Sequence, residues 1–226
     1  MSLKSRVKHT LFGPAGMRPR EIKHGLLKGL KFNVDTAHKS MRLMGMDERE
    51  IERDVRELAS RAASALDIGA NDGWYGVYFA SLPNIQKVYA FEPGDDFGPN
   101  LEQNLALNDA NLLKKITYVK KMVGNRDDEK WCSIDSFVHD LPRPALFKID
   151  VDGGEMDVLR GASKTLAADE SLIVLETHSL ELEQQCEKFL RDMGFKTRIV
   201  DKGWYRLFLP EARQIAHNRW MIATRS

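Results

Sequence analysis

The sequence predicts an α/β protein whose sheet is mainly parallel and covered by helices on both faces. Short apolar runs alternate with helical patterns from about residue 65 onward, as in parallel strands joined by crossover helices. A glycine-rich turn follows the first apolar run, and an acidic residue, Glu92, follows the second. This combination is typical of sheets that bind a ribose-containing cofactor beyond the carboxyl ends of their strands.

Seven apolar runs have the length and composition of strands, at residues 65–68, 88–91, 116–123, 146–151, 172–176, 196–200 and 220–224. Helical patterns separate most of these runs, at residues 74–81, 99–108, 155–168 and 180–193. Gly194 is a stop signal for the last helix, and Gly203-Trp204 is a turn signal before the final run.

A basic segment precedes this pattern. Residues 1–31 contain eight Lys and Arg residues but one acid, Glu21. We therefore expect residues 1–46 to form a basic appendage or lid on a main domain of residues 47–226; a surface for anionic partners is the alternative. Residues 46–63 have apolar positions at helical spacing and predict an amphipathic helix, with Asp47 and Glu50 as its capping pair.

Composition narrows the class of protein. The chain has 226 residues, a net charge of +1 and 30% charged residues, so it has no polyelectrolyte character that would indicate a nucleic-acid partner. No apolar run approaches ~18 residues and no signal peptide is visible, which predicts a cytoplasmic protein without a membrane span. Cys132 and Cys186 are isolated and expected to be reduced thiols. The sequence leaves a homodimer open.

The glycine-rich turn itself, Asp67-Ile-Gly-Ala-Asn-Asp-Gly73, discriminates between cofactors. Dinucleotide enzymes need a second glycine where this chain has Asn71, because the pyrophosphate approaches bare backbone there. A nicotinamide-dependent oxidoreductase is therefore the disfavoured alternative. A non-catalytic binding module that retains the fold is the other alternative.

Several further motifs occur in order along the chain. Together with the turn, they are Val88–Pro93, Leu105–Asn108, Val123-Gly124, Ser133–Asp135, Lys148–Glu155, Val158–Ala162 and Val174–His178. From about residue 65 to 180 the chain resembles the FkbM family of methyltransferases. The resemblance departs at Asp152, where the family usually has glutamate, and at Gly76, where a small hydroxyl residue is common.

The resemblance implies a Rossmann-like class I methyltransferase fold, with a mainly parallel seven-stranded sheet and an antiparallel last strand. It also implies S-adenosyl-L-methionine as the cofactor and a hydroxyl of a small molecule, such as a sugar, a glycan or a polyketide precursor, as the methyl acceptor.

The same resemblance assigns the cofactor-binding residues. Glu92, followed by Pro93, is expected to accept hydrogen bonds from the ribose hydroxyls, because a carboxylate only accepts. The cofactor's amino-acid end is expected near Asp67 and the turn residues Gly69, Asn71 and Gly73. Asp67 could instead cap the turn, and Asn71 could be a left-handed turn residue. Asp127 and Asp128 are either adenine contacts or part of a solvated loop.

The predicted catalytic residues are Asp150 and His178. Lys148 and Asp150 share one side of an apolar strand, which predicts an ion pair of Lys148 with Asp67 and leaves Asp150 facing the acceptor; a structural ion pair is the alternative. His178 ends the next strand and is a candidate general base. We expect no metal, although a divalent ion held by Asp150 and His178 is a less favoured alternative. Asp152 is a candidate N-cap for the helix that follows it.

Overall fold

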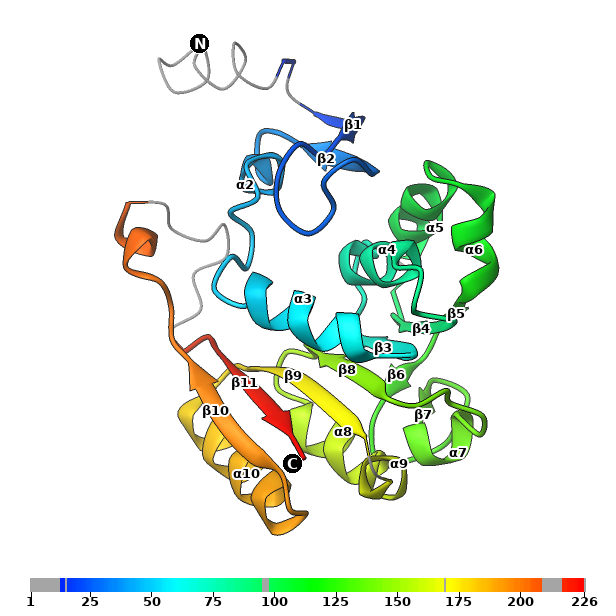
Figure 1. Ribbon diagram of the computed structural model, residues 1–226, viewed down its shortest axis with the longest axis vertical. Helices are drawn as coiled ribbons and strands as arrows, with labels where there is room; N and C mark the ends of the chain where they lie inside the picture. The colour runs from blue at the N-terminus through cyan, green and yellow to red at the C-terminus, as the bar shows by residue number, and fades with distance from the viewer. Residues whose placement is uncertain (1–12, 15, 95–97, 169, 209–216, 226) are drawn as a thin grey trace.

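The computed structural model describes residues 13–14, 16–94, 98–168, 170–208 and 217–225. A seven-stranded sheet runs through it in the order β10-β11-β9-β8-β3-β4-β5 (Figure 1). Its strands are β3 (Ser64–Ile68), β4 (Lys87–Phe91), β5 (Ile116–Val119), β8 (Ala145–Ile149), β9 (Ser171–Thr177), β10 (Lys196–Val200) and β11 (Arg219–Thr224). Every pair is parallel except those made by β11, which is antiparallel to β9 and β10. The predicted architecture is confirmed.

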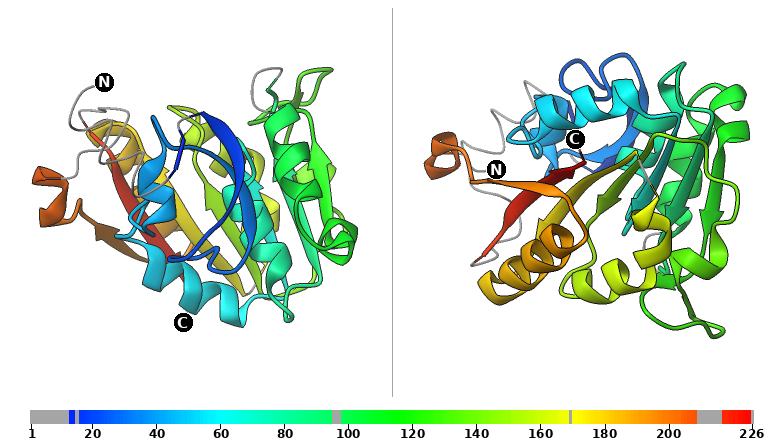
Figure 2. Two further views of the ribbon diagram at one scale, coloured as in Figure 1. Left: turned by 90° about the horizontal axis from the view of Figure 1, so that it is seen from above. Right: turned by 60° about the horizontal axis from the view of Figure 1, so that its bottom comes forward.

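Helices cover both faces of the sheet (Figure 2, right). One face carries α3 (Glu52–Arg61), α4 (Trp74–Ser81), α5 (Gly98–Ala106) and α6 (Ala110–Lys115). The other carries α7 (Ile134–Phe137), α8 (Glu155–Gly161), α9 (Ser163–Ala167) and α10 (Leu180–Asp192). The sheet separates two hydrophobic cores because successive strand residues point to opposite faces: Leu146 packs with the first core, Phe147 with the second.

The positions of some predicted elements were wrong. The run 116–123 contains two strands, β5 and the short β6 (Met122–Val123), which pairs with β7 (Trp131–Cys132). The pattern at 155–168 forms two helices, and the pattern at 99–108 is followed by a separate helix, α6, whose N-cap is Asp109.

The expected capping pair of the helix before β3 is also wrong. Helix α3 begins only at Glu52, and its N-cap Ile51 makes no side-chain capping bond. The carboxylates of Asp47 and Glu50 are used in ion pairs instead, with Arg42 and Arg206 respectively.

The described part of the N-terminal segment forms a hairpin of β1 (Met17–Glu21) and β2 (Lys31–Asp35), followed by α2 (Ser40–Leu43). Ile22, Leu27, Phe32 and Val34 are fully buried in the first core. Phe32 lies edge-on against Trp74 of α4, with ring centroids 5.1 Å apart. The division at residue 46 stays a prediction, but this hairpin shares its apolar contacts with the main sheet.

Two expectations from composition concern the cysteines and membrane-spanning helices. Cys132 and Cys186 are free and buried, as expected of reduced thiols. In the described part of the chain, none of the helices combines the length and the apolar character that a membrane crossing requires.

Candidate active site

The turn after β3 brings two loops of the sheet edge into direct contact. Gly69 has a φ of 83°, and a Cβ built on it would lie 1.8 Å from the carbonyl oxygen of Asp150. Only glycine allows this approach of the first loop to the loop after β8. Asn71, with a φ of 49°, is left-handed as one alternative predicted, and Gly73, with a φ of 86°, is the N-cap of α4.

Glu92 follows β4 and is anchored to the same turn. Its Oε2 accepts a hydrogen bond from the backbone N–H of Asn71 at 2.8 Å, and its Oε1 accepts one from the N–H of Gly94 at 3.1 Å. The residue is 8% exposed, and burial raises the pKa of its carboxylate. Each oxygen retains a second acceptor site, so the group is held in place without being saturated.

A cavity of about 290 Å³ opens above this turn, close to the lower limit of about 300 Å³ for ligand pockets. Gly69, Asn71, Glu92 and Pro93 line it, as do the predicted catalytic Asp150 and, beside it, Asp152. The Oδ1 atom of Asn71 is buried and has no hydrogen-bond partner among the described residues. We call this the cofactor cavity. Its remaining wall is formed by Phe91, Lys121, Met122, Val123, Trp131, Val151 and Gly154.

The far wall of the cofactor cavity depends on Trp131, which sequence reasoning missed. The Trp131 ring lies against Gly124, where a Cβ would approach it to 2.9 Å. Asp128 is outside the cavity wall, and its Oδ1 accepts the backbone N–H of Trp131 at 2.9 Å. Asp127 is likewise outside, bonded to Ser133. Both aspartates stabilise an exposed turn, so the solvated-loop interpretation holds for them.

Asp67 lies behind the turn rather than in the cavity wall. It is 2% exposed, and burial raises its pKa to about 7, although a hydrogen bond from the Gly76 backbone N–H opposes this shift. Its Oδ2 has no hydrogen-bond partner within the described chain. A Cβ on Gly76 would lie 3.4 Å from that oxygen. The cofactor role of Asp67 stays a prediction.

Lys148 is the central cation of a buried charged layer on the α4 face of the sheet. It is 1% exposed, and its Nζ lies 3.8 Å from Glu48, 3.8 Å from Asp150 and 3.6 Å from Glu176. The predicted pair with Asp67 is not among its ion pairs, because β9 and the segment before α3 supply closer carboxylates. Burial alone would lower the pKa of Lys148, but Glu48, Asp150 and Glu176 raise it above its usual value.

Glu48 and Glu176 extend this layer. Tyr75 donates its hydroxyl hydrogen to Glu48 Oε2 at 2.5 Å, and Trp220 donates its Nε1–H to Glu176 Oε2 at 3.0 Å. Burial, followed by the neighbouring Asp150, raises the pKa of Glu176 to about 8. Sequence reasoning missed both acids, because nothing local marks Glu48 and because Glu176 stands inside a predicted strand.

A second cavity, of about 200 Å³, lies on the other side of Asp150 and Asp152. We call it the acceptor cavity. It is strongly polar, since its wall consists of His38, Lys39, Met41, Arg42, Asp47, Glu48, Asp150, Asp152, Glu176, His178, Arg206, Asn218 and Trp220. The two aspartates therefore form a wall shared by the two cavities.

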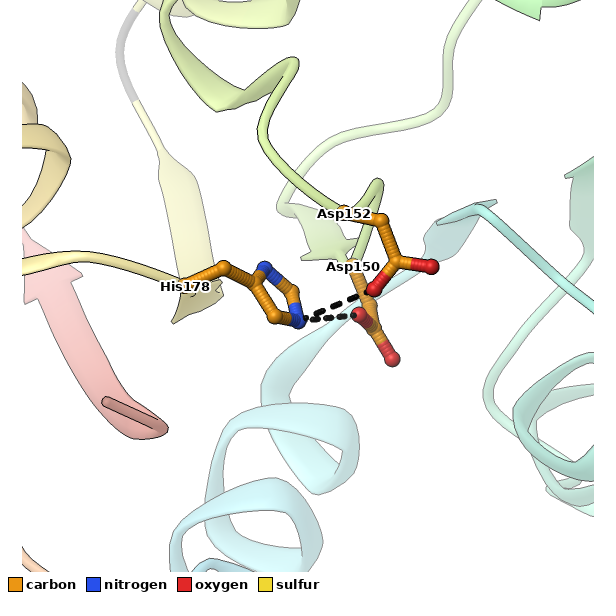
Figure 3. A group of neighbouring side chains, drawn as sticks. All are labelled: Asp150, Asp152 and His178. Atoms are coloured by element: carbon orange, nitrogen blue, oxygen red, sulfur yellow. Dashed lines mark ion pairs between the residues drawn. The ribbon is translucent and has the colours of Figure 1, made fainter. Parts of the chain in front are cut away.

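His178 faces that shared wall from the end of β9 (Figure 3). Its Nδ1 lies 2.5 Å from Oε1 of Glu155, which is fully buried, and its Nε2 lies 3.6 Å from Asp150 and 3.3 Å from Asp152. Burial alone would lower the pKa of His178, but the Glu155 bond and the surrounding carboxylates raise it. The structure thus brings together the two predicted catalytic residues.

Asp152 does not cap α8, contrary to the prediction. The N-cap of that helix is Gly154, without a side-chain bond, and Glu155 accepts the Gly153 N–H at 3.0 Å instead. Asp152 has a φ of 47°, which turns its side chain toward His178 instead of the helix end. Positive φ in a residue other than glycine is uncommon and tends to occur at functional sites.

The segment around α2 connects the acceptor cavity to the cofactor turn. Lys39 and Arg42 both line the acceptor cavity, and both bond to Oδ2 of Asp72, at 2.8 and 2.6 Å. Asp72 is 5% exposed and lies between the turn residues Asn71 and Gly73. Burial alone would raise the pKa of Asp72, but the two cations lower it. The N-terminal segment is therefore in ionic contact with the cofactor turn.

Three aromatic residues, Trp74, Tyr75 and Trp204, divide between core and surface. Trp74 and Tyr75 are each 6% exposed and belong to the first core. Trp204 is 77% exposed, in the short 3-10 helix η1 (Trp204–Leu207), which also provides Arg206 to the acceptor cavity. The residues that follow η1, from 209 to 216, lie outside the described residues.

Comparison with known proteins gives a family match and one curated relative. Residues 124–197 match the family model described as the methyltransferase FkbM domain. The chain is 22% identical over 193 residues to the hexuronic acid methyltransferase AglP of Haloferax volcanii, which covers 75% of this chain and 79% of the relative.

Solved structures share the fold. Methyltransferase FkbM from Methylobacillus flagellatus aligns with a TM-score of 0.60 at 16% identity, over 83% of this chain and 53% of that one. Precorrin-6y C5,15-methyltransferase from Geobacter metallireducens aligns with a TM-score of 0.52 at 17% identity, over 77% and 88% of the two chains. The chain thus spans about half of the first solved protein and has the class I methyltransferase fold.

Proposed function

We propose that this chain, an FkbM-type methyltransferase by its domain match at residues 124–197 and its fold, is an S-adenosylmethionine-dependent O-methyltransferase. Its acceptor would be a hydroxyl of a small molecule, with a sugar or sugar acid preferred to a polyketide precursor. One observation carries the proposal: Asp150 and Asp152 separate a cavity built on the glycine turn and Glu92 from a second, polar cavity that contains His178. Methyl transfer needs two such ligand sites in contact.

The residues of the cofactor cavity fit S-adenosylmethionine. Glu92 offers acceptor sites for the two ribose hydroxyls, and the orphaned Asn71 Oδ1 offers another acceptor at the turn. Phe91, Met122, Val123 and Trp131 supply the apolar and aromatic walls that a purine requires. Gly69 and Gly73 shape the turn, and Asp67 supports it from behind. When bound, this cofactor supplies an electrophilic methyl group on a sulfonium.

The acceptor cavity fits a compact polyhydroxylated molecule. Its lining carboxylates accept hydrogen bonds from hydroxyl groups, while Lys39 and Arg206 stand at the same cavity as donors. The hexuronic acid named in the curated relative is a molecule of this kind. With a net charge of +1, the chain lacks the basic character expected for a nucleic-acid substrate.

The proton of the acceptor hydroxyl would leave at the shared wall. Because Glu155 holds Nδ1 of His178, the neutral imidazole keeps its lone pair on Nε2, which faces Asp150 and Asp152. In the simplest form of the proposal, Nε2 takes the hydroxyl proton as general base, and Asp150 orients the hydroxyl. The side chain of His178 is 10% exposed and that of Asp150 is 33% exposed, so the imidazole is the better shielded of the two groups.

Two measurements test this proposal. Calorimetry should show binding of S-adenosylhomocysteine and none of the oxidised nicotinamide dinucleotide; the reverse result would make the chain an oxidoreductase candidate. Transfer of a labelled methyl group should then be measured with glucuronic acid, glucose and a simple phenol as acceptors.

The role of His178 is tested by its alanine variant. We expect His178→Ala to reduce turnover at least about 100-fold, since general-base catalysis typically contributes 10²–10⁴, while leaving S-adenosylhomocysteine affinity within about twofold. Full activity of the variant would exclude His178 from proton transfer, and equal losses in binding and turnover would indicate a structural role.

A further inference from the structure

We propose that Asp150, Asp152 and His178 form a binding site for a divalent cation in the wall shared by the cofactor and acceptor cavities. The inference rests on the proposed function, because the cation would hold the acceptor hydroxyl beside the methyl group. It specifies how that hydroxyl becomes acidic, and it changes the role of His178 from general base to ligand.

The three side chains have the spacing that a metal ion requires. One ligand atom from each residue lies within 4.8 Å of the others, with His178 Nε2 at 3.6 Å from Asp150 Oδ1 and 3.3 Å from Asp152 Oδ1 (Figure 3). They come from two neighbouring loops, after β8 and after β9, so rigid strand ends hold them. A cation placed between them would be about 2 Å from each ligand atom.

His178 provides an observation independent of the two carboxylates. Its side chain is 10% exposed, and its Nε2 makes no hydrogen bond to the described residues although it is aimed at the shared wall. Its other nitrogen is bound to Glu155, which is fully buried. A histidine held through one nitrogen by a buried carboxylate, with the other nitrogen facing further carboxylates, is arranged as metal-binding histidines commonly are.

The distribution of charge explains why the cation would bind here. A neighbouring carboxylate group, Glu48, Asp150 and Glu176, has comparable spacing, but the Lys148 ammonium lies within 3.8 Å of each member. That group already contains its cation. On the other side of Asp150, the carboxylates of Asp152 and Glu155 lie beside His178, whose imidazole carries a charge only when it is protonated.

The ligand set indicates the class of ion. Two carboxylate oxygens and one imidazole nitrogen suit Mn²⁺ and similar first-row ions, and also Mg²⁺ with several retained waters. Three protein ligands leave coordination positions open, and the acceptor cavity adjoins them. A hydroxyl bound there would lose its proton more readily because the cation stabilises the alkoxide.

The methyl transfer would release one proton. The proton of the acceptor hydroxyl would leave to solvent through the acceptor cavity, and the oxygen would take the methyl group from S-adenosylmethionine. The electron pair of the broken carbon–sulfur bond would stay on sulfur.

The experiment uses Mn²⁺ alone, without cofactor or acceptor. Titration of the full chain should remove the electron paramagnetic resonance signal of free Mn²⁺ with one ion per chain, and pulsed spectra should show nitrogen coupling from His178. Asp152→Asn should weaken Mn²⁺ at least 10-fold. Asp157→Asn is the matched control, because Asp157 is an acid of the following helix with a side chain 59% exposed, and its affinity should equal that of the native chain.

The possible outcomes separate this inference from the proposed function. Absence of Mn²⁺ binding at millimolar concentration, or equal affinity of the native chain and Asp152→Asn, overturns the cation site. If Asp152→Asn does not fold, His178→Asn provides the same test. The cation site predicts that the nitrogen coupling is lost in this variant, and persistence of the coupling overturns the site. S-adenosylhomocysteine binding without Mn²⁺ binding removes only the cation site, whereas Mn²⁺ binding without cofactor binding supports the site and contradicts the proposed function.

Discussion

Replacing Glu92 by alanine should weaken the binding of S-adenosylhomocysteine by about 10² to 10⁴. The carboxylate lines the cofactor cavity, and its two oxygens each accept one backbone hydrogen bond, from Asn71 and Gly94. A ribose would add two hydrogen bonds to an ionised acceptor, each worth about 1.5–3 kcal/mol. Their loss, roughly 3–6 kcal/mol, corresponds to the stated range at about 1.4 kcal/mol per tenfold.

Calorimetry measures this affinity directly, and two variants control the result. Glu92→Gln keeps one acceptor oxygen and the shape of the side chain, so it should lose less affinity than the alanine variant. Glu102→Ala removes an acid whose side chain is 57% exposed and should bind normally. Thermal unfolding establishes that each variant is folded. A dissociation constant for Glu92→Ala within twofold of the native value would refute the assignment of Glu92 to the ribose.

Two further predictions concern the turn and the buried charges. Gly69→Ala should lose at least about 2 kcal/mol more unfolding free energy in urea than Gly194→Ala: both glycines have a φ near 85°, but only at Gly69 does the new Cβ meet a backbone atom, at 1.8 Å. Equal losses would contradict the close contact with Asp150. Asp67 has its pKa raised from 3.8 to about 7, chiefly by burial, so the folded state binds its proton more tightly than the unfolded state. The resulting stabilisation is complete below about pH 4 and is lost as the pH rises through 7, by at most about 4 kcal/mol. Asp67→Asn should therefore lose less unfolding free energy than the native chain between pH 5 and 8, and parallel pH profiles would show that Asp67 is ionised throughout.

The parts of the fold that sequence predicted are those with local signals. The strands β3 and β4 are short apolar runs bounded by turn residues, and Asp67 to Gly73 and Glu92 stand at their carboxyl ends, so sheet topology alone brings these ends to one edge. His178 and Asp150 were predictable as neighbours for the same reason, since β8 and β9 are adjacent and parallel.

The remaining site residues depend on contacts between distant segments. Glu48 reaches Lys148 across 100 residues of sequence, and Trp131 enters the cofactor cavity through the short β6–β7 pairing, which has no periodic pattern. Sequence reasoning gave Glu155 no role, although this residue ends the motif Lys148–Glu155. Its contact with His178 depends on the path of the loop before α8. The prediction that Asp152 caps α8 was wrong for a local reason. Aspartate before a helix is a frequent N-cap, but the backbone of Asp152 is left-handed, with a φ of 47°, and the sequence does not show this.

The ionic contact of Lys39 and Arg42 with Asp72 has a consequence for any shortened form of this protein. A chain cut at residue 46, where composition suggests a boundary, would leave the Asp72 carboxylate without either of these counter-ions. Depriving a buried ion of its partner typically costs about 3–5 kcal/mol. The damage would appear one residue from Asn71, in a loop that the deletion does not touch. Truncation at this predicted boundary would thus weaken binding of the proposed cofactor, although the change is made outside the cofactor cavity.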